Sequence, residues 1–117
     1  MDIETFRNYC LSKKGVTESF PFDQNTLVFK VMDKMFAISD VDNFESINLK
    51  CDPEMAVDLR ERYTDVLPGW HMNKKHWNTI VMSGSVGDNL LDEWIDLSYD
   101  LVVVGLSGKI KKELSEF

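Results

Sequence analysis

Apolar side chains at the start of the chain recur at the spacing of a helix. Ile3, Phe6 and Cys10 are three and four positions apart, and basic residues occupy the end of this pattern, where positive charge favours the carboxyl end of a helix. Gly15 follows, and glycine readily adopts the left-handed conformation that closes helices. The pattern predicts a helix over residues 2–14 that ends at Gly15.

The part of the chain from residue 26 to residue 51 is rich in residues that favour strands. Three strands are predicted, at 26–32, 35–41 and 46–51, and the links between them are short enough for antiparallel hairpins. The segment before them, 16–25, contains the sequence Phe20-Pro21-Phe22 and is expected to form a packed loop.

The clearest helix start is the sequence Cys51-Asp52-Pro53-Glu54. Asp52 can accept hydrogen bonds from the free amides of the first turn, and proline suits the first helical position. Glu54 adds negative charge near the positive end of the helix dipole. We therefore expect a helix over 53–63 with Asp52 as a structural N-cap and an inward face formed by Met55, Ala56, Leu59 and Tyr63.

The last third of the chain is predicted to contain a hairpin followed by a long helix. Residues 67–82 form two extended arms around a turn at 73–75, and the second arm, 77–82, has the clearer strand pattern. The longest helix is expected over 88–106, where apolar residues again recur at spacings near three and four. Residues 109–117 are expected to form a short helical tail.

The predicted order of elements is α-β-β-β-α-β-β-α. Hairpin-linked strands that are interrupted by helices, rather than alternating with them, are typical of α+β domains. We predict that residues 1–117 form one domain, because this length suits a single core. Its expected architecture is a single antiparallel sheet of about five strands with helices packed on one face.

The chain is acidic, with 13 Lys and Arg against 20 Asp and Glu and a formal net charge of −7. This balance disfavours general attraction to nucleic acids or anionic membranes, so contact with a polyanion must come from a local patch. No apolar run is long enough to span a membrane, and the first residues lack the basic and apolar regions of a signal peptide. We expect a cytoplasmic protein without membrane contact, whose cysteines, Cys10 and Cys51, are free thiols.

Catalytic and metal-binding patterns are weak. His71 and His76 are five positions apart, a spacing that suits neither one helical face nor one strand face, and no acidic or cysteine ligand accompanies them. Cys51 precedes a helix start, but the charge of Asp52 opposes a thiolate. No serine-nucleophile or phosphate-loop motif occurs. The sequence therefore predicts no enzyme, no metal site and no cofactor.

Residues 68–79, PGWHMNKKHWNT, form the one segment in which basic and aromatic residues cluster without an acid. Interleaved lysines and rings are typical of segments that contact phosphates and stack on bases. Trp70 and Trp77 could equally belong to the core, because tryptophan dominates packing wherever it is buried. Composition alone leaves both interpretations open.

Three long strings in the chain, LKCDPEMAVDLRERY, PGWHMNKKHWNTI and WIDLSYDLVV, closely resemble the MmcQ/YjbR-like family of small bacterial proteins, and the resemblance spans nearly the whole chain. It implies an α+β domain with one small sheet and flanking helices. It also implies a DNA-binding role in which loops or hairpins act as wings. Two positions differ from the family pattern. Trp70 occupies a position where tyrosine is expected, and Gly87 occupies a position where proline often begins the last helix.

From this resemblance we expect weak DNA binding through the 70–78 hairpin, without catalysis. Lys74 and Lys75 would contact phosphates, and exposed rings would lie near sugars or bases. The alternative is a protein-interaction or chaperone-like module, because the fold class is close to that of small secretion-type chaperones. The predicted contact residues are His71, Asn73, Lys74, Lys75, His76, Trp77 and Asn78.

Overall fold

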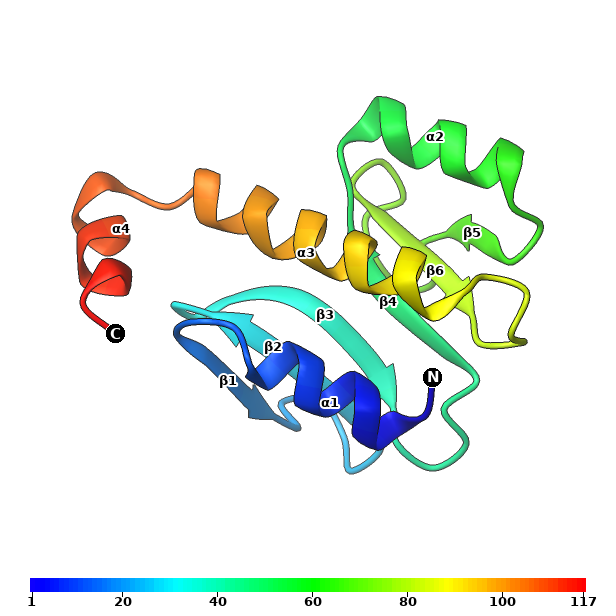
Figure 1. Cartoon of the computed structure of the whole chain (residues 1–117), viewed down its shortest axis with the longest axis horizontal. Coiled ribbons are helices and arrows are strands. Elements are labelled where there is room, and N and C mark those ends of the chain that lie inside the picture. Colours follow the sequence, from blue (N-terminus) through cyan, green and yellow to red (C-terminus); the bar gives the residue numbers. More distant parts are fainter.

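The structure is a computed structural model that describes residues 1–117. A single antiparallel sheet of six strands runs through it, accompanied by four helices (Figure 1). The elements in chain order are α1 (Ile3–Leu11), β1 (Val16–Ser19), β2 (Thr26–Val31), β3 (Lys34–Asp40), β4 (Ser46–Lys50), α2 (Pro53–Arg62), β5 (Val66–Pro68), β6 (Trp77–Val81), α3 (Asp88–Val104) and α4 (Gly108–Ser115). Across the sheet the strand order is β1-β2-β3-β4-β6-β5.

The predicted α+β class with one antiparallel sheet is confirmed, and the sheet has one strand more than expected. The additional strand is β1, which pairs with β2 in the register Val16↔Val31. The expectation of a packed loop over 16–25 was therefore wrong. Its first residues form an edge strand, and Phe20 and Phe22 beyond it are 48% and 65% exposed. β1 is short and has one neighbour only, so it carries little of the hydrophobic alternation that reveals a strand.

Side-chain caps fix three of the helix starts, and at α1 the Asp2 carboxylate accepts a hydrogen bond from the Thr5 amide (2.8 Å). At α2, Asp52 accepts hydrogen bonds from the Glu54 amide (3.2 Å) and the Met55 amide (3.3 Å), which confirms it as the N-cap. At α4, the Ser107 hydroxyl accepts a hydrogen bond from the Ile110 amide (3.2 Å), and the expected helical tail is present. These caps satisfy amides that have no partner inside the helix.

The first helix ends earlier than predicted, at Leu11. The lysines that follow lie in the turn to β1, and Gly15 closes that turn with a left-handed φ of 73°. A side chain at this position would be strained, and a Cβ atom would stand 2.5 Å from Leu114 Cδ1 of α4. Glycine therefore allows both the sharp turn and the close approach of α4.

Helices cover one face of the sheet (Figure 1), as predicted. α1 and α3 lie across this face, and α2 packs over the end formed by β5 and β6. Phe6 of α1 meets Phe29 of β2 edge-on with ring centroids 5.6 Å apart, and Tyr63 beside α2 meets Trp94 of α3 at 5.3 Å. None of the helices has both the length and the hydropathy needed to cross a bilayer.

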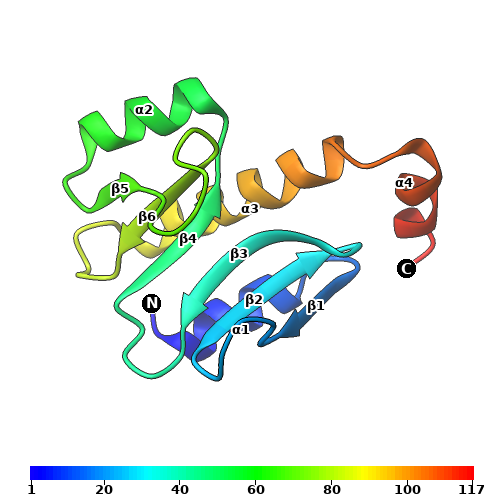
Figure 2. The same ribbon diagram turned by 180° about the vertical axis from the view of Figure 1, so that it is seen from behind.

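No helix covers the opposite face, which Figure 2 shows. A smaller cluster of Val28, Ile38 and Trp77 is buried there, and Met35 and Met72 pack against it. Met72 belongs to the segment between β5 and β6. That segment therefore folds over the uncovered face of the sheet and shields part of it from water.

Candidate functional site

The basic and aromatic segment forms the loop between β5 and β6, residues 69–76, which we term the β5–β6 loop. The Gly69 amide donates a hydrogen bond to Trp77 O (2.9 Å) and joins the two ends. Inside the loop, the His76 and Trp77 amides both donate to Asn73 O, at 3.1 and 3.0 Å. The predicted hairpin is present, but β5 has only three residues and the loop is longer than the tight turn that was expected.

Arg60 of α2 holds this loop from outside. Its Nε donates to Asn78 Oδ1 (2.7 Å), and its Nη2 donates to Trp77 O (3.2 Å) and to Lys74 O. Asn78 Nδ2 in turn donates to Ala56 O of α2 (3.3 Å). Arg60 has no signal in the sequence, because a contact between a helix and a distant loop leaves no local spacing pattern.

Three cations, Arg60, Lys74 and Lys75, surround a hollow of about 490 Å³ between the β5–β6 loop and the first turns of α2. Lys74 Nζ donates to Gly69 O (3.0 Å), so part of its hydrogen-bonding capacity holds the loop. Lys75 makes no side-chain hydrogen bond, and no ion pair of the protein includes either lysine. Glu54 is the one acidic side chain that lines the hollow. Positive charge therefore prevails on this side of the loop.

The seven predicted contact residues divide into exposed and buried positions. Trp77 and Asn78 are 7% and 2% exposed, because Trp77 packs on the uncovered sheet face and Asn78 faces α2. Burial leaves Trp77 and Asn78 little surface for a ligand. His76 is half-buried. The exposed residues are His71, Asn73, Lys74 and Lys75.

Trp70 was not among the predicted contacts, although it is 69% exposed. Its indole lies beside the His71 imidazole, with ring centroids 4.5 Å apart and planes inclined by 36°. The Trp70 amide donates to Thr79 Oγ1 (2.9 Å), and His71 adopts a left-handed φ of 59°. The two rings thus project from a backbone that is anchored to β6. No spacing signal in the sequence distinguishes this exposed tryptophan from the buried Trp77.

Neither cysteine is prepared for nucleophilic chemistry. Burial, and then the charge of Asp52, raises the pKa of the Cys51 thiol to about 11. Burial also raises the pKa of Cys10 well above its ordinary range. Both thiols are therefore protonated at neutral pH, whereas the thiolate is the reactive form. No three His, Cys, Asp or Glu side chains come together in an arrangement that could hold a metal ion.

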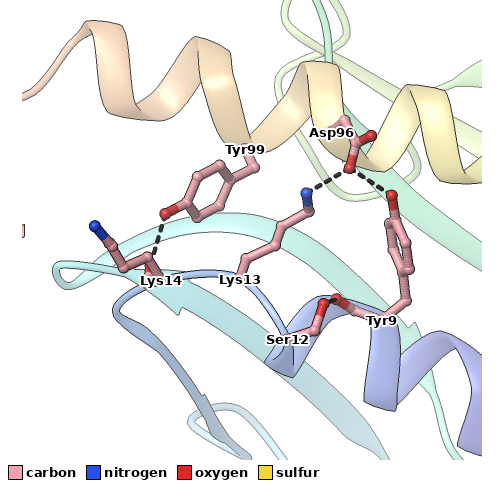
Figure 3. Close-up of polar contacts among 6 residues, drawn as sticks. All are labelled: Tyr9, Ser12, Lys13, Lys14, Asp96 and Tyr99. Carbon is pink, nitrogen blue, oxygen red and sulfur yellow. Dashed lines mark hydrogen bonds and ion pairs between the residues drawn. The ribbon is translucent and has the colours of Figure 1, made fainter. Parts of the chain in front are cut away.

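A second polar cluster joins α1 to α3 on the helical side of the sheet (Figure 3). The Lys13 ammonium contacts the Asp96 carboxylate, which also accepts a hydrogen bond from the Tyr9 hydroxyl (2.7 Å). The ammonium lies 5.1 and 5.2 Å from the ring centroids of Tyr9 and Tyr99. The Tyr99 hydroxyl donates to Lys14 O (2.6 Å). Because the charges are matched within the cluster, we interpret it as a structural link between the two helices.

The fold and the loop define a small α+β domain that presents a basic and aromatic loop at one end of its sheet. Residues 11–101 match the family model described as YjbR, and the chain belongs to the YjbR family. The protein YjbR of Escherichia coli K12 is 36% identical over 104 residues, which cover 88% of each chain. The protein YbdF of Escherichia coli O157:H7 is 34% identical over 112 residues, which cover 95% of this chain and 92% of YbdF.

Solved structures share the same architecture. The crystal structure of Deinococcus radiodurans DR2400, a protein with the domain DUF419, superposes with a TM-score of 0.91 at 37% identity, covering 97% of this chain and 88% of DR2400. A crystal structure of a Pseudomonas syringae protein gives a TM-score of 0.73 at 26% identity, covering 86% of this chain and 98% of that protein. The arrangement of sheet and helices is therefore common to these proteins.

Proposed function

We propose that this domain binds single-stranded nucleic acid weakly through the β5–β6 loop and catalyses no reaction. The observation that carries the proposal is the unpaired positive charge of Lys75, with Lys74 and Arg60 beside it, in a chain of net charge −7. The exposed rings of Trp70 and His71 extend from the same loop. A phosphate-binding element and a stacking element thus occur together on one short segment.

The phosphate side of the proposed site is the hollow between the loop and α2. Arg60 and the Gly69 carbonyl fix the course of the loop through the hydrogen bonds to Lys74 and Trp77. Lys75 consequently emerges from a fixed backbone and keeps its ammonium free for a ligand. Contact with one phosphate releases about one condensed counterion, which favours binding most strongly at low salt.

The base side of the proposed site is the Trp70–His71 pair. Stacking on an aromatic side chain stabilises a bound base by about 1–3 kcal/mol and tolerates any base. Unpaired bases present the faces that such stacking needs, so single strands are favoured over duplexes. Few contacts and the repulsion from a body of charge −7 keep the expected affinity low.

A binding role without catalysis is supported by the state of the nucleophiles. The raised pKa of Cys51 and the burial of Cys10 keep both thiols protonated at neutral pH. The loop contains imidazoles that can accept a proton, but residues 69–76 include no serine, threonine, cysteine or carboxylate to act as a nucleophile. For the location of the protein, our proposal is the cytoplasm, where both unpaired thiols would stay reduced.

The proposal is tested by titrating fluorescently labelled single-stranded and double-stranded DNA with the protein at low and at physiological salt. Lys75→Ala should flatten the slope of log affinity against log salt by roughly 0.7 for a single strand. Trp70→Ala should weaken single-strand binding by about 1–3 kcal/mol. Lys112→Ala on α4 is the matched control, because it removes an exposed lysine far from the loop.

Two results would contradict the proposal. The first is the absence of binding at low salt, where the electrostatic contribution is largest. The second is an equal loss of affinity in Lys75→Ala and Lys112→Ala, since that would show general charge attraction without a site on the loop.

A further inference from the structure

The other side of the β5–β6 loop borders a groove of about 510 Å³ on the uncovered face of the sheet, the face that Figure 2 shows. One rim is the link between β1 and β2, which contributes Phe22 and Asp23, and the opposite rim is the loop with Trp70. Ile38 of β3 lies in the floor. This volume falls within the range of sites that hold small molecules or a few side chains of a peptide.

Large aromatic side chains flank the groove and remain in contact with water. Phe22 and Trp70 are about two-thirds exposed, although each has a large apolar surface that water solvates poorly. They come from segments far apart in the sequence, yet both line the same groove. Exposed apolar surface that is rimmed by polar residues is typical of interaction sites.

The charge of the groove is opposite to that of the hollow beside α2. Asp23, Asp40 and Glu45 line it, and its lining contains no lysine or arginine. Amides fix two of these carboxylates in place. Asp23 accepts hydrogen bonds from the Asn25 amide (2.8 Å) and the Thr26 amide (2.6 Å). Asp40 accepts a hydrogen bond from the Glu45 amide (3.1 Å). Glu45 makes no side-chain hydrogen bond, so its carboxylate is free to meet a ligand.

We propose that this groove binds a segment of a partner protein that carries an arginine or lysine next to an apolar residue. The cation would lie between the carboxylates and the indole face of Trp70, where charge pairing and the cation–π interaction act together. The apolar neighbour would cover Phe22 and Ile38. Charge complementarity favours this occupant, because the three carboxylates attract a cationic side chain and repel phosphate groups, which the proposed nucleic-acid site places on the other side of the loop.

The proposed peptide groove is independent of the proposed nucleic-acid site. The two sites lie on opposite sides of one loop and have opposite charges, formed by Lys75 with its neighbours on one side and by Glu45 with its neighbours on the other. A failure at either site therefore leaves the other untouched, apart from variants of Trp70 and His71, which contribute to both.

The test is a fluorescence anisotropy titration with a short labelled peptide in which arginine flanks leucine, compared with the same peptide bearing citrulline, a neutral analogue, in place of arginine. The arginine peptide should bind at low salt, and the citrulline peptide about tenfold more weakly. Unlabelled arginine peptide should also change the emission of Trp70, because the other two tryptophans, Trp77 and Trp94, are buried.

Matched variants locate the binding. Glu45→Lys should weaken the arginine peptide about tenfold, whereas Glu93→Lys, the same charge change on the helical side of the protein, should alter it less than about twofold. Phe22→Ala should weaken it, whereas Phe20→Ala, outside the groove, should not. Lys75→Ala should leave peptide binding intact.

Several outcomes would overturn the proposal. They are equal affinity for the arginine and citrulline peptides, no binding of either at low salt, and equal effects of Glu45→Lys and Glu93→Lys. Sedimentation analysis of the protein alone adds one more. Self-association that Glu45→Lys abolishes would identify a second copy of the chain as the occupant and would refute the partner-protein assignment.

Discussion

Arg60→Met is expected to destabilise the protein, because it removes the donor that holds the β5–β6 loop against α2. The main loss is at Asn78 Oδ1, a buried acceptor 2.7 Å from Arg60 Nε. Leaving such an acceptor without a partner costs about 1–3 kcal/mol. The other two hydrogen bonds of Arg60 add little to the loss. Trp77 O still accepts a hydrogen bond from the Gly69 amide, and water can replace the guanidinium as the donor to the carbonyl of the exposed Lys74. We expect the free energy of unfolding to fall by about 2 kcal/mol.

Urea titration followed by circular dichroism measures this change, provided that the slope of the free energy against urea stays constant. Arg62→Met is the matched control. Arg62 lies on the same helix and pairs with Asp58 on the exposed surface at 3.1 Å, a type of contact worth about 0.3–0.5 kcal/mol. Equal losses of stability in the two variants would refute the role assigned to Arg60.

A double-mutant cycle isolates the bond between Arg60 and Asn78. Each single change, Arg60→Met or Asn78→Ala, should destabilise the protein, and the double variant should lose less than the sum by about 1 kcal/mol or more. Hydrogen exchange of the loop amides should accelerate in Arg60→Met, because the loop loses its outer support. Strict additivity of the two substitutions would show that the bond contributes nothing measurable.

Three further substitutions test the structural assignments. Asp52→Ala removes the N-cap of α2 and should lower the free energy of unfolding by about 1 kcal/mol, and an unchanged urea midpoint would contradict the capping role. Asp92→Asn should raise the melting temperature at neutral pH. Burial, and secondly the neighbouring carboxylates, raise the pKa of Asp92, and its buried Oδ1 has no hydrogen-bond partner. Ionisation of Asp92 is therefore unfavourable in the folded state. A lower melting temperature would contradict this reasoning. Tyr9→Phe should be less stable than the native protein below pH 10, because the hydrogen bond to Asp96, and secondly burial, raises the pKa of Tyr9 from 10.0 to about 12. That stability is lost as the pH rises through the higher value, so urea midpoints of the two proteins should converge near pH 12, and a constant difference would refute the link.

Elements with a local chemical signal were predictable from the sequence. The start of α2 follows from Asp52 and Pro53, because a capping carboxylate and an N-terminal proline act within one turn of the chain. The long helix α3 follows from its apolar period. β1 was missed because an edge strand buries little, and the first helix was overextended because the lysines after Leu11 belong to a turn that Gly15 closes.

Composition indicated where the candidate site lies in the chain, but not which of its residues are exposed. Composition marked the segment around Lys74 and Lys75, and both are exposed in the loop. Composition could not separate the exposed Trp70 from the buried Trp77, because the side chains are identical and their exposure depends on where the loop crosses the sheet. Composition also could not reveal the contact of Arg60 with the loop or the acidic groove, because both are formed by segments that meet only in the folded chain.

The nucleic-acid proposal is tested most directly by NMR titration of the isotopically labelled protein with single-stranded DNA at low salt. We expect the amide signals of residues 69–76, the Trp70 indole signal and the signals of the first turn of α2 to shift progressively, while those of α4 stay in place. Added salt should reverse the shifts, because the binding depends on phosphate contacts. Signals that stay unchanged at the highest DNA concentration, or shifts confined to α4 and its exposed lysines, would contradict the account.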